Sequence, residues 1–186
     1  MQVKTVLNKC HKFKSFVFNE VKFSGAEIVV KVVPRQNGKA VCSGCGRGAP
    51  LYDPLKERSF EFVPLWGYRV FFVYRMRRVN CPDCGVIVEK VPWGDGKKEL
   101  TTSYMLFLAQ WARKMSWQEV AGTFRTSWEK VFHSIKHVVA WGLAHRDLSG
   151  ITAVGVDEVS WSKGHKYLTL AYQIDSHCTR LLWIGR

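Results

Sequence analysis

The chain has 186 residues, 47% of them hydrophobic and 13% aromatic, with 28 Lys and Arg against 15 Asp and Glu. This length and apolar content allow one sizeable core or two or three small modules, and they exclude a disordered polypeptide. The formal net charge of +13 favours a polyanionic partner. The excess is uneven, because the first 150 residues carry +12 of it.

The amino terminus does not resemble a signal peptide, since Met1–Cys10 lacks an apolar core. No apolar run approaches the roughly 18–20 residues that a membrane span requires. We therefore expect a cytoplasmic, nucleoid-associated protein with no membrane partner. Without a secretion signal, the six cysteines indicate metal binding rather than disulfides.

The first part of the chain has the pattern of β-strands. The run Ala26–Val33 is rich in β-branched residues and stops at Pro34, and a turn follows at Asn37-Gly38. Apolar and basic residues then alternate between Glu57 and Arg78. One predicted face holds Val70, Phe72, Tyr74 and Met76, and the other holds Arg69, Phe71, Val73, Arg75 and Arg77.

Two Cys-x-x-Cys pairs, Cys42/Cys45 and Cys81/Cys84, predict a four-thiolate zinc site. The strand-rich insert between them can run out and back as a hairpin, which would bring the second pair to the first. Four thiolates leave no position for water, so the zinc would be structural. Because the region is small, the metal should contribute a large part of its folding free energy, on the order of ten kcal/mol. Chelation should therefore unfold the module. Cys10 and Cys178 are interpreted as ordinary buried or half-buried thiols.

The apolar spacing becomes helical from Leu100 onward. Two capping boxes, Ser116-Trp-Gln-Glu119 and Thr126-Ser-Trp-Glu129, predict a short helix over 117–124 and a longer one from about Ser127. Trp128, Val131, Phe132, Ile135 and Val138 are expected to face inward. The pair is typical of a helix-turn-helix, although a plain helical bundle has the same pattern.

A helix-turn-helix would present the start of its second helix to the major groove. The expected base-facing residues are Arg125, Thr126, Ser127, Lys130 and His133, and Arg113 and Lys136 would lie nearer phosphates. His133 and His137 share a helical face, but without a third ligand they are interpreted as surface or DNA-facing residues rather than metal ligands.

The last part of the chain predicts three strands, over 151–156, 167–174 and 179–184, in a meander. Asp157 follows the first of them, where a carboxylate can project from a sheet edge toward a metal ion. Alone this is a weak signal. Asp175 is interpreted as a turn residue.

The order of these features resembles transposases of the ISL3 family of bacterial insertion sequences. The resemblance rests on the two cysteine pairs, the helix pair over 116–139, and Gly155-Val-Asp-Glu158 followed by Lys163-Gly-His-Lys-Tyr167. It implies a ribonuclease-H-like domain in which two Asp and one Glu hold two divalent ions, Mg²⁺ or Mn²⁺ in a complete domain. Asp157 matches the first of these acids. The other two have no counterpart before Arg186, so the resemblance implies an incomplete active site and leaves enzymatic activity of this chain open.

The expected fold is therefore α+β and multi-module. It comprises a β-rich zinc ribbon over 1–97, a helix-turn-helix domain over 98–148, and an incomplete ribonuclease-H-like three-stranded sheet over 149–186. Such a sheet would expose an edge, so it could pair with a second copy, aggregate or be partly disordered.

The leading hypothesis is the amino-terminal portion of a transposase that binds double-stranded DNA at the terminal inverted repeats. A zinc-containing helix-turn-helix regulator that dimerises through the last sheet is the main alternative. An RNA-binding zinc ribbon is a third reading, since aromatic side chains can stack on bases.

Overall fold

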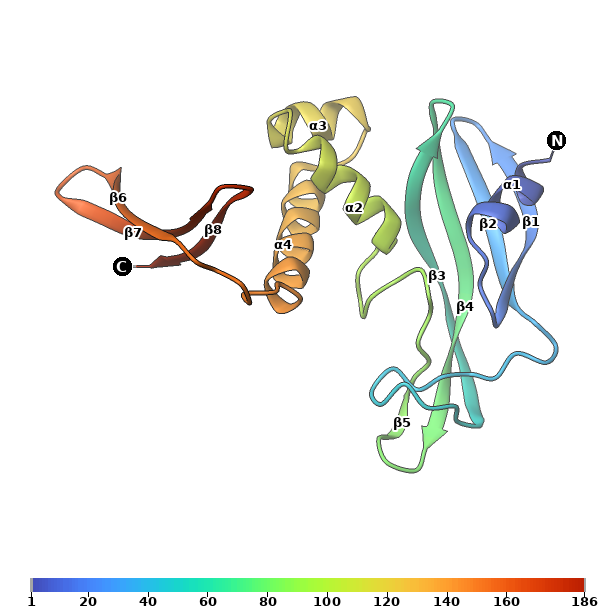
Figure 1. Cartoon of the computed structure of the whole chain (residues 1–186). Coiled ribbons are helices and arrows are strands. Elements are labelled where there is room, and N and C mark those ends of the chain that lie inside the picture. The colour runs from blue at the N-terminus through green and yellow to red at the C-terminus, as the bar shows by residue number, and fades with distance from the viewer. Residues whose placement is uncertain (1, 186) are drawn as a thin grey trace. The chain divides into compact units, whose positions relative to one another are not determined.

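The computed structural model describes residues 2–185 and divides the chain into two compact units, one up to Trp141 and one from Gly142 (Figure 1). The described residues form a mixed α+β fold with two sheets and four helices. No helix among the described residues is both long enough and apolar enough to span a membrane.

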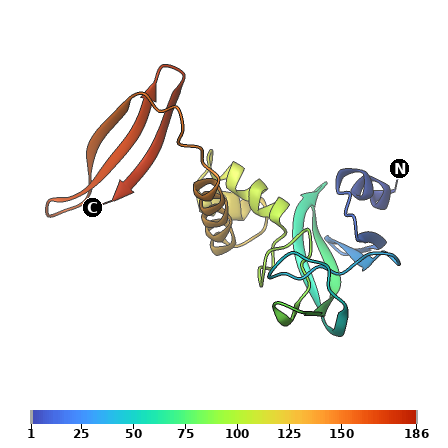
Figure 2. The ribbon, with the colours of Figure 1, turned by 60° about the horizontal axis from the view of Figure 1, so that its bottom comes forward.

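The first unit opens with a helix and a five-stranded sheet (Figure 2). The sheet runs in the order β1-β2-β4-β3, and β5 pairs with β4. All pairs are antiparallel except β2 with β4, which is parallel. The elements are α1 (Val3–Cys10), β1 (Phe16–Ser24), β2 (Glu27–Pro34), β3 (Leu51–Leu65), β4 (Tyr68–Cys81) and β5 (Gly85–Val88).

The core of this sheet follows the period-two pattern of β4. Val70, Phe72, Tyr74 and Met76 are at most 3% exposed, which confirms the predicted inward face. They pack with apolar side chains of α1, β1, β2 and β3 and with Trp93. The ring of Trp93 packs edge-on against the rings of Phe16 and Tyr74, with ring centroids 4.9 and 5.4 Å apart.

The arginines of β4 are largely paired within the chain. Arg69 bonds to the carboxylates of Glu27 and Glu61, and Arg78 forms a bidentate pair with Asp53 at 2.7 and 2.5 Å. Arg69 and Arg78 are thus neutralised locally, whereas Arg75 of the predicted basic face is exposed and donates to the Leu55 carbonyl.

Three helices complete the first unit: α2 (Thr102–Trp111), α3 (Trp117–Thr123) and α4 (Trp128–Ala144), the last ending just beyond the unit boundary. The capping box at Ser116 is confirmed, with Glu119 N–H donating to Ser116 Oγ and Ser116 N–H donating to the Glu119 carboxylate. The second predicted cap is off by one residue. Ser127 Oγ, not the Thr126 hydroxyl, accepts the amide of Lys130 at 3.3 Å.

The helices bury a core of their own, which consists of Leu100, Tyr104, Met105, Leu108, Val120, Ala121 and Val131. On α4 the buried stripe is Val131 and Ser134, with Ile135 and Val138 half-buried. The expectation that Trp128 and Phe132 face inward is wrong, because they are 50% and 37% exposed. They lie at the edge of the stripe, where Phe132 instead packs on Trp117 of α3.

The second unit is the predicted antiparallel meander, built from β6 (Val154–Ser162), β7 (Lys166–Asp175) and β8 (Cys178–Gly185). Its first strand begins and ends later than expected. Asp157 therefore lies inside β6, opposite Leu170 of β7, and not at the end of a strand. The segment before β6 is held to β8 by Arg180, whose Nη2 donates to the Asp147 carbonyl at 2.6 Å.

Candidate metal centre and nucleic-acid interface

Four cysteines from two distant parts of the chain meet at one end of the first unit. Cys42 and Cys45 lie in the loop before β3, and Cys81 and Cys84 lie at the end of β4 and in the turn before β5. The long β3–β4 hairpin reverses at Trp66-Gly67 and returns the second pair to the first. All four Sγ atoms lie within 4.8 Å of one another.

This geometry fits a tetrahedral zinc ion. Zinc–sulfur bonds of about 2.3 Å place neighbouring sulfurs of a tetrahedron about 3.8 Å apart, and Cys45 Sγ and Cys81 Sγ are separated by 3.6 Å. The glycine after each pair has a positive φ, +75° at Gly46 and +70° at Gly85, as such tight turns require. The thiolate set could therefore hold a structural zinc ion with all four positions filled by protein.

The surroundings of the first cysteine pair favour thiolates, because the pKa values of Cys42 and Cys45 are lowered. The pKa values of Cys81 and Cys84 are instead raised by burial and by the neighbouring cysteines. Arg47, after the first pair, forms an ion pair with Asp83 in the second and so links the two turns. Its backbone amide and its guanidinium lower the pKa of Cys45 to about 6. Cys42 and Cys81 are buried, whereas Cys45 and Cys84 are exposed.

A buried carboxylate connects the cysteine cluster to the sheet. Glu89 is 2% exposed and accepts hydrogen bonds from Tyr74 Oη at 2.5 Å and from Arg77 Nε and Nη2 at 2.8 and 2.6 Å. Its backbone pairs with Cys42 in an isolated bridge. Sequence reasoning missed Glu89, although a single acid after the apolar run Val86-Ile-Val88 was an available signal.

The residues expected to contact DNA lie around α3 and α4. Arg113 and Arg125 are exposed in the turns that precede and follow α3, and His133 and Lys136 are exposed on α4. Ser127 caps α4. Thr126 is half-buried, and its hydroxyl has no hydrogen-bond partner among residues 2–185.

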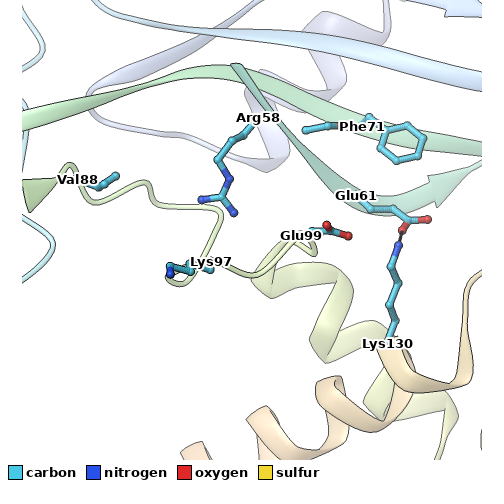
Figure 3. A pocket seen from close by; sticks show the side chains of 8 residues that line it. Arg58, Glu61, Phe71, Val88, Lys97, Glu99 and Lys130 are labelled. Carbon is cyan, nitrogen blue, oxygen red and sulfur yellow. Dashed lines mark hydrogen bonds and ion pairs between the residues drawn. The ribbon is translucent and has the colours of Figure 1, made fainter. Parts of the chain in front are cut away.

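Lys130 is placed differently from the others (Figure 3). Its Nζ lies 2.9 Å from Oε2 of Glu61, a carboxylate only 3% exposed. Arg69 donates to the other oxygen, Oε1, from Nε and Nη2. Glu61 also pairs through its backbone with the segment before α2, accepting from Thr101 N–H and donating to the Glu99 carbonyl. Lys130 thus fastens α4 to β3.

Farther along α4, His137 makes a second connection. Its Nδ1 lies 2.7 Å from Nζ of Lys98, which also pairs with Asp95 at 2.8 Å. Both partners belong to the segment that joins the sheet to α2. The side of α4 that carries Lys130 and His137 is therefore held to the preceding chain at two points, about 10 Å apart at 1.5 Å per residue.

In the second unit Asp157 is exposed, and its Oδ1 accepts the amide of Glu158 at 2.8 Å. Asp175 closes β7 and accepts from Thr152 and Gln173. The cysteine cluster is the one place within residues 2–185 where three or more His, Cys, Asp or Glu side chains come close enough to share a metal ion. Asp157 belongs to no such set.

The chain thus has an α+β fold with four clustered cysteines that could bind a metal. Among known proteins, it is similar to transposases of insertion sequences. The chain is 30% identical to the transposase for insertion sequence element IS1557 of Mycobacterium tuberculosis, over 91% of this chain and 40% of the relative. It is 27% identical to the transposase for insertion sequence element IS1001 of Bordetella parapertussis, over 78% of this chain and 36% of the relative.

The chain thus spans about two fifths of the length of the curated relatives it matches. No family model matches it. No solved structure matches it. The similarity to these relatives supports a transposase.

Proposed function

We propose that this chain is the DNA-binding portion of an insertion-sequence transposase that resembles the ISL3 family, and that it binds duplex DNA at the terminal inverted repeats. The observation that carries the proposal is the pairing of α3 with α4. A seven-residue helix is followed by a four-residue turn and a 17-residue helix, with a side-chain cap at the start of each helix. That arrangement supports a helix-turn-helix, a motif in which the second helix enters the major groove.

The exposed side chains at the start of α4 suit base contacts. Arg125 lies in the turn before α4, and its own backbone φ is +51°, a strained conformation for a residue other than glycine. Ser127 caps the start of α4, and His133 lies on the helix. An arginine can bind guanine with two hydrogen bonds, and hydroxyl and imidazole groups can contact several base edges.

The metal centre has a supporting role in this proposal. A filled four-thiolate zinc holds the end of the β3–β4 hairpin and takes no part in bond cleavage. Strand cutting and joining would belong to the longer protein, where Asp157 would be the first of three acids that bind two divalent ions.

Binding to element ends tests the proposal. We expect the zinc-loaded chain to bind a duplex from the end of the element that carries its gene more tightly than a scrambled duplex of equal length. Arg125→Ala should reduce that preference about tenfold or more, the usual value of one good base contact, with an unchanged melting temperature. Fluorescence anisotropy with both duplexes provides the measurement.

Arg35→Ala is the matched control, because Arg35 is exposed in the loop after β2 and its loss changes the net charge equally. A wild-type chain without preference for the element end would refute the proposal. Specific binding to a site away from the inverted repeats would instead favour a zinc-containing helix-turn-helix regulator.

A further inference from the structure

The segment that joins the sheet to α2 forms a loop against α4. This linker loop, Asp95–Lys98, is held by the contact between Lys98 and His137. Between the loop and α4 lies a groove of about 660 Å³. Its lining residues are Asp95, Gly96, Lys97 and Lys98 from the loop and His133, Lys136, His137 and Ala140 from the helix.

The loop lies on one side of the outward face of α4, and α3 lies on the other. Phe132 contacts Trp117 of α3, with ring centroids 5.5 Å apart, and His137 contacts the loop. His137 lies five residues after Phe132, and at about 100° per residue this is one full turn plus about 140°. The two side chains therefore leave the helix axis about 140° apart. The face between these two contacts carries Lys136, opposite the buried Val131.

The unpaired charge in this groove is positive. Asp95 is neutralised by Lys98, and this ion pair lowers the pKa of the Asp95 carboxyl. Lys97 and Lys136 are exposed, and within residues 2–185 neither forms an ion pair. Figure 3 shows Lys97 on the loop that precedes Glu99. Two lysines thus remain available to an anion, one on each side of the groove.

We propose that the linker loop is a second DNA-contacting element, in which Lys97 binds a phosphate of one strand while α4 lies in the major groove. The two phosphate backbones border that groove, so an element beside a groove-entering helix meets one of them. The Lys98–His137 contact would keep the loop in position along α4. This inference rests on the proposed function, and its predicted partner is the sugar-phosphate backbone of duplex DNA.

The test is the salt dependence of binding to a 30-base-pair duplex of mixed sequence, since a phosphate contact is independent of sequence. Lys97→Ala should reduce the slope of log affinity against log salt by about 0.9, the value for one phosphate contact. Affinity should then fall up to about eightfold at 0.1 M salt and be unchanged on extrapolation to 1 M. Lys22→Ala is the control for the loss of one lysine away from the groove, because Lys22 lies in β1, its side chain is 69% exposed and it pairs with Glu20 of the same strand at 3.1 Å.

The outcomes are distinct. A lower slope for Lys97→Ala, with the wild-type slope for Lys22→Ala, supports the inference. Equal slopes for both variants and a salt-sensitive wild type would overturn it and leave the proposed DNA binding intact. A wild type whose affinity does not depend on salt would overturn both. Thermal unfolding of Lys97→Ala should match the wild type, because the side chain is exposed and lies in a loop.

Discussion

Lys130 shows how the partner of one side chain changes its expected role. Its place on the second helix suggests a base contact, yet its ammonium lies against the buried carboxylate of Glu61. That carboxylate has a second cation, Arg69. A buried charge that loses one of its partners is costly, so Lys130 contributes to the attachment of α4 whether or not it also contacts DNA.

We therefore expect Lys130→Ala to lower the free energy of unfolding by roughly 1.5–3 kcal/mol, the range for a hydrogen bond to a charged group. Lys136→Ala, an exposed site on the same helix, should leave it nearly unchanged. Urea titration of both variants is the measurement. Full stability together with weaker DNA binding in Lys130→Ala would show that the lysine leaves Glu61 for DNA.

Asp175 gives the second unit a dependence on pH. The Thr152 hydroxyl and the Gln173 amide donate to its carboxylate, and they hold the pKa of Asp175 below its ordinary value of 3.8. A lowered pKa means that the ionised form stabilises the fold. This stabilisation is complete above the unfolded pKa and disappears as the pH falls through the folded one.

Hydrogen exchange of the β7 and β8 amides can measure this effect. At pH 7 the wild type should be better protected than Asp175→Asn, and the difference should decrease as the pH falls below 3.8, the ordinary pKa of the carboxyl group. An Asn variant as well protected as the wild type at pH 7 would show that the ionised carboxylate does not contribute.

At the scale of elements, the β3–β4 hairpin joins two separate cores. The sheet core around Val70 and Phe72 is large and apolar. The core around the cysteines consists of Ala40, Cys42, Val79 and Cys81. A core this small cannot offset the entropy of its loops, so the metal-binding end should depend on zinc, whereas the sheet should not. This differs from the expectation that chelation unfolds the whole module.

Removal of zinc should therefore have a local effect. We expect Cys84→Ser or a strong chelator to release the metal and to increase hydrogen exchange in residues 40–50 and 81–88. Protection of β2 and of the middle of β4 should persist. Cys10→Ser is the control, since Cys10 is exposed on α1 and distant in sequence from both pairs. Elemental analysis should find one zinc per chain in the control, and an unchanged metal content in Cys84→Ser would contradict the four-thiolate assignment.

At the scale of the whole chain, the fold pairs part of the basic excess behind the net charge of +13 with acids and leaves part of it exposed. Three arginines of β4 are paired with acids of neighbouring segments, as in the pair of Arg77 with Glu89, the residue after β5. Exposed cations such as Lys97, Arg125 and Lys136 lie on the linker loop, in the turn before α4 and on α4. The proposed position of DNA would use these cations, although exposed lysines such as Lys31 of β2 and Lys56 of β3 also lie on the sheet.

Local patterns were sufficient for several features of this protein. The alternation of Val70, Phe72, Tyr74 and Met76 predicts a strand face because successive side chains point to opposite sides. The Cys-x-x-Cys spacing predicts the clustering of thiols, and Ser116 with Glu119 predicts the start of α3. The strand face and the helix cap depend on residues a few positions apart. The cysteine cluster is predictable because one metal ion can bind both pairs only if they come together.

Contacts between distant segments were decided only by the tertiary structure. The parallel pairing of β2 with β4, the burial of Glu61 and Glu89, and the pairing of Lys130 depend on which strands become neighbours. A sequence pattern shows that a residue is charged but not which partner it meets 69 positions away. The amino-acid sequence alone thus determined the kinds of elements and the thiolate set, and packing determined which charges support the fold and which remain available to bind.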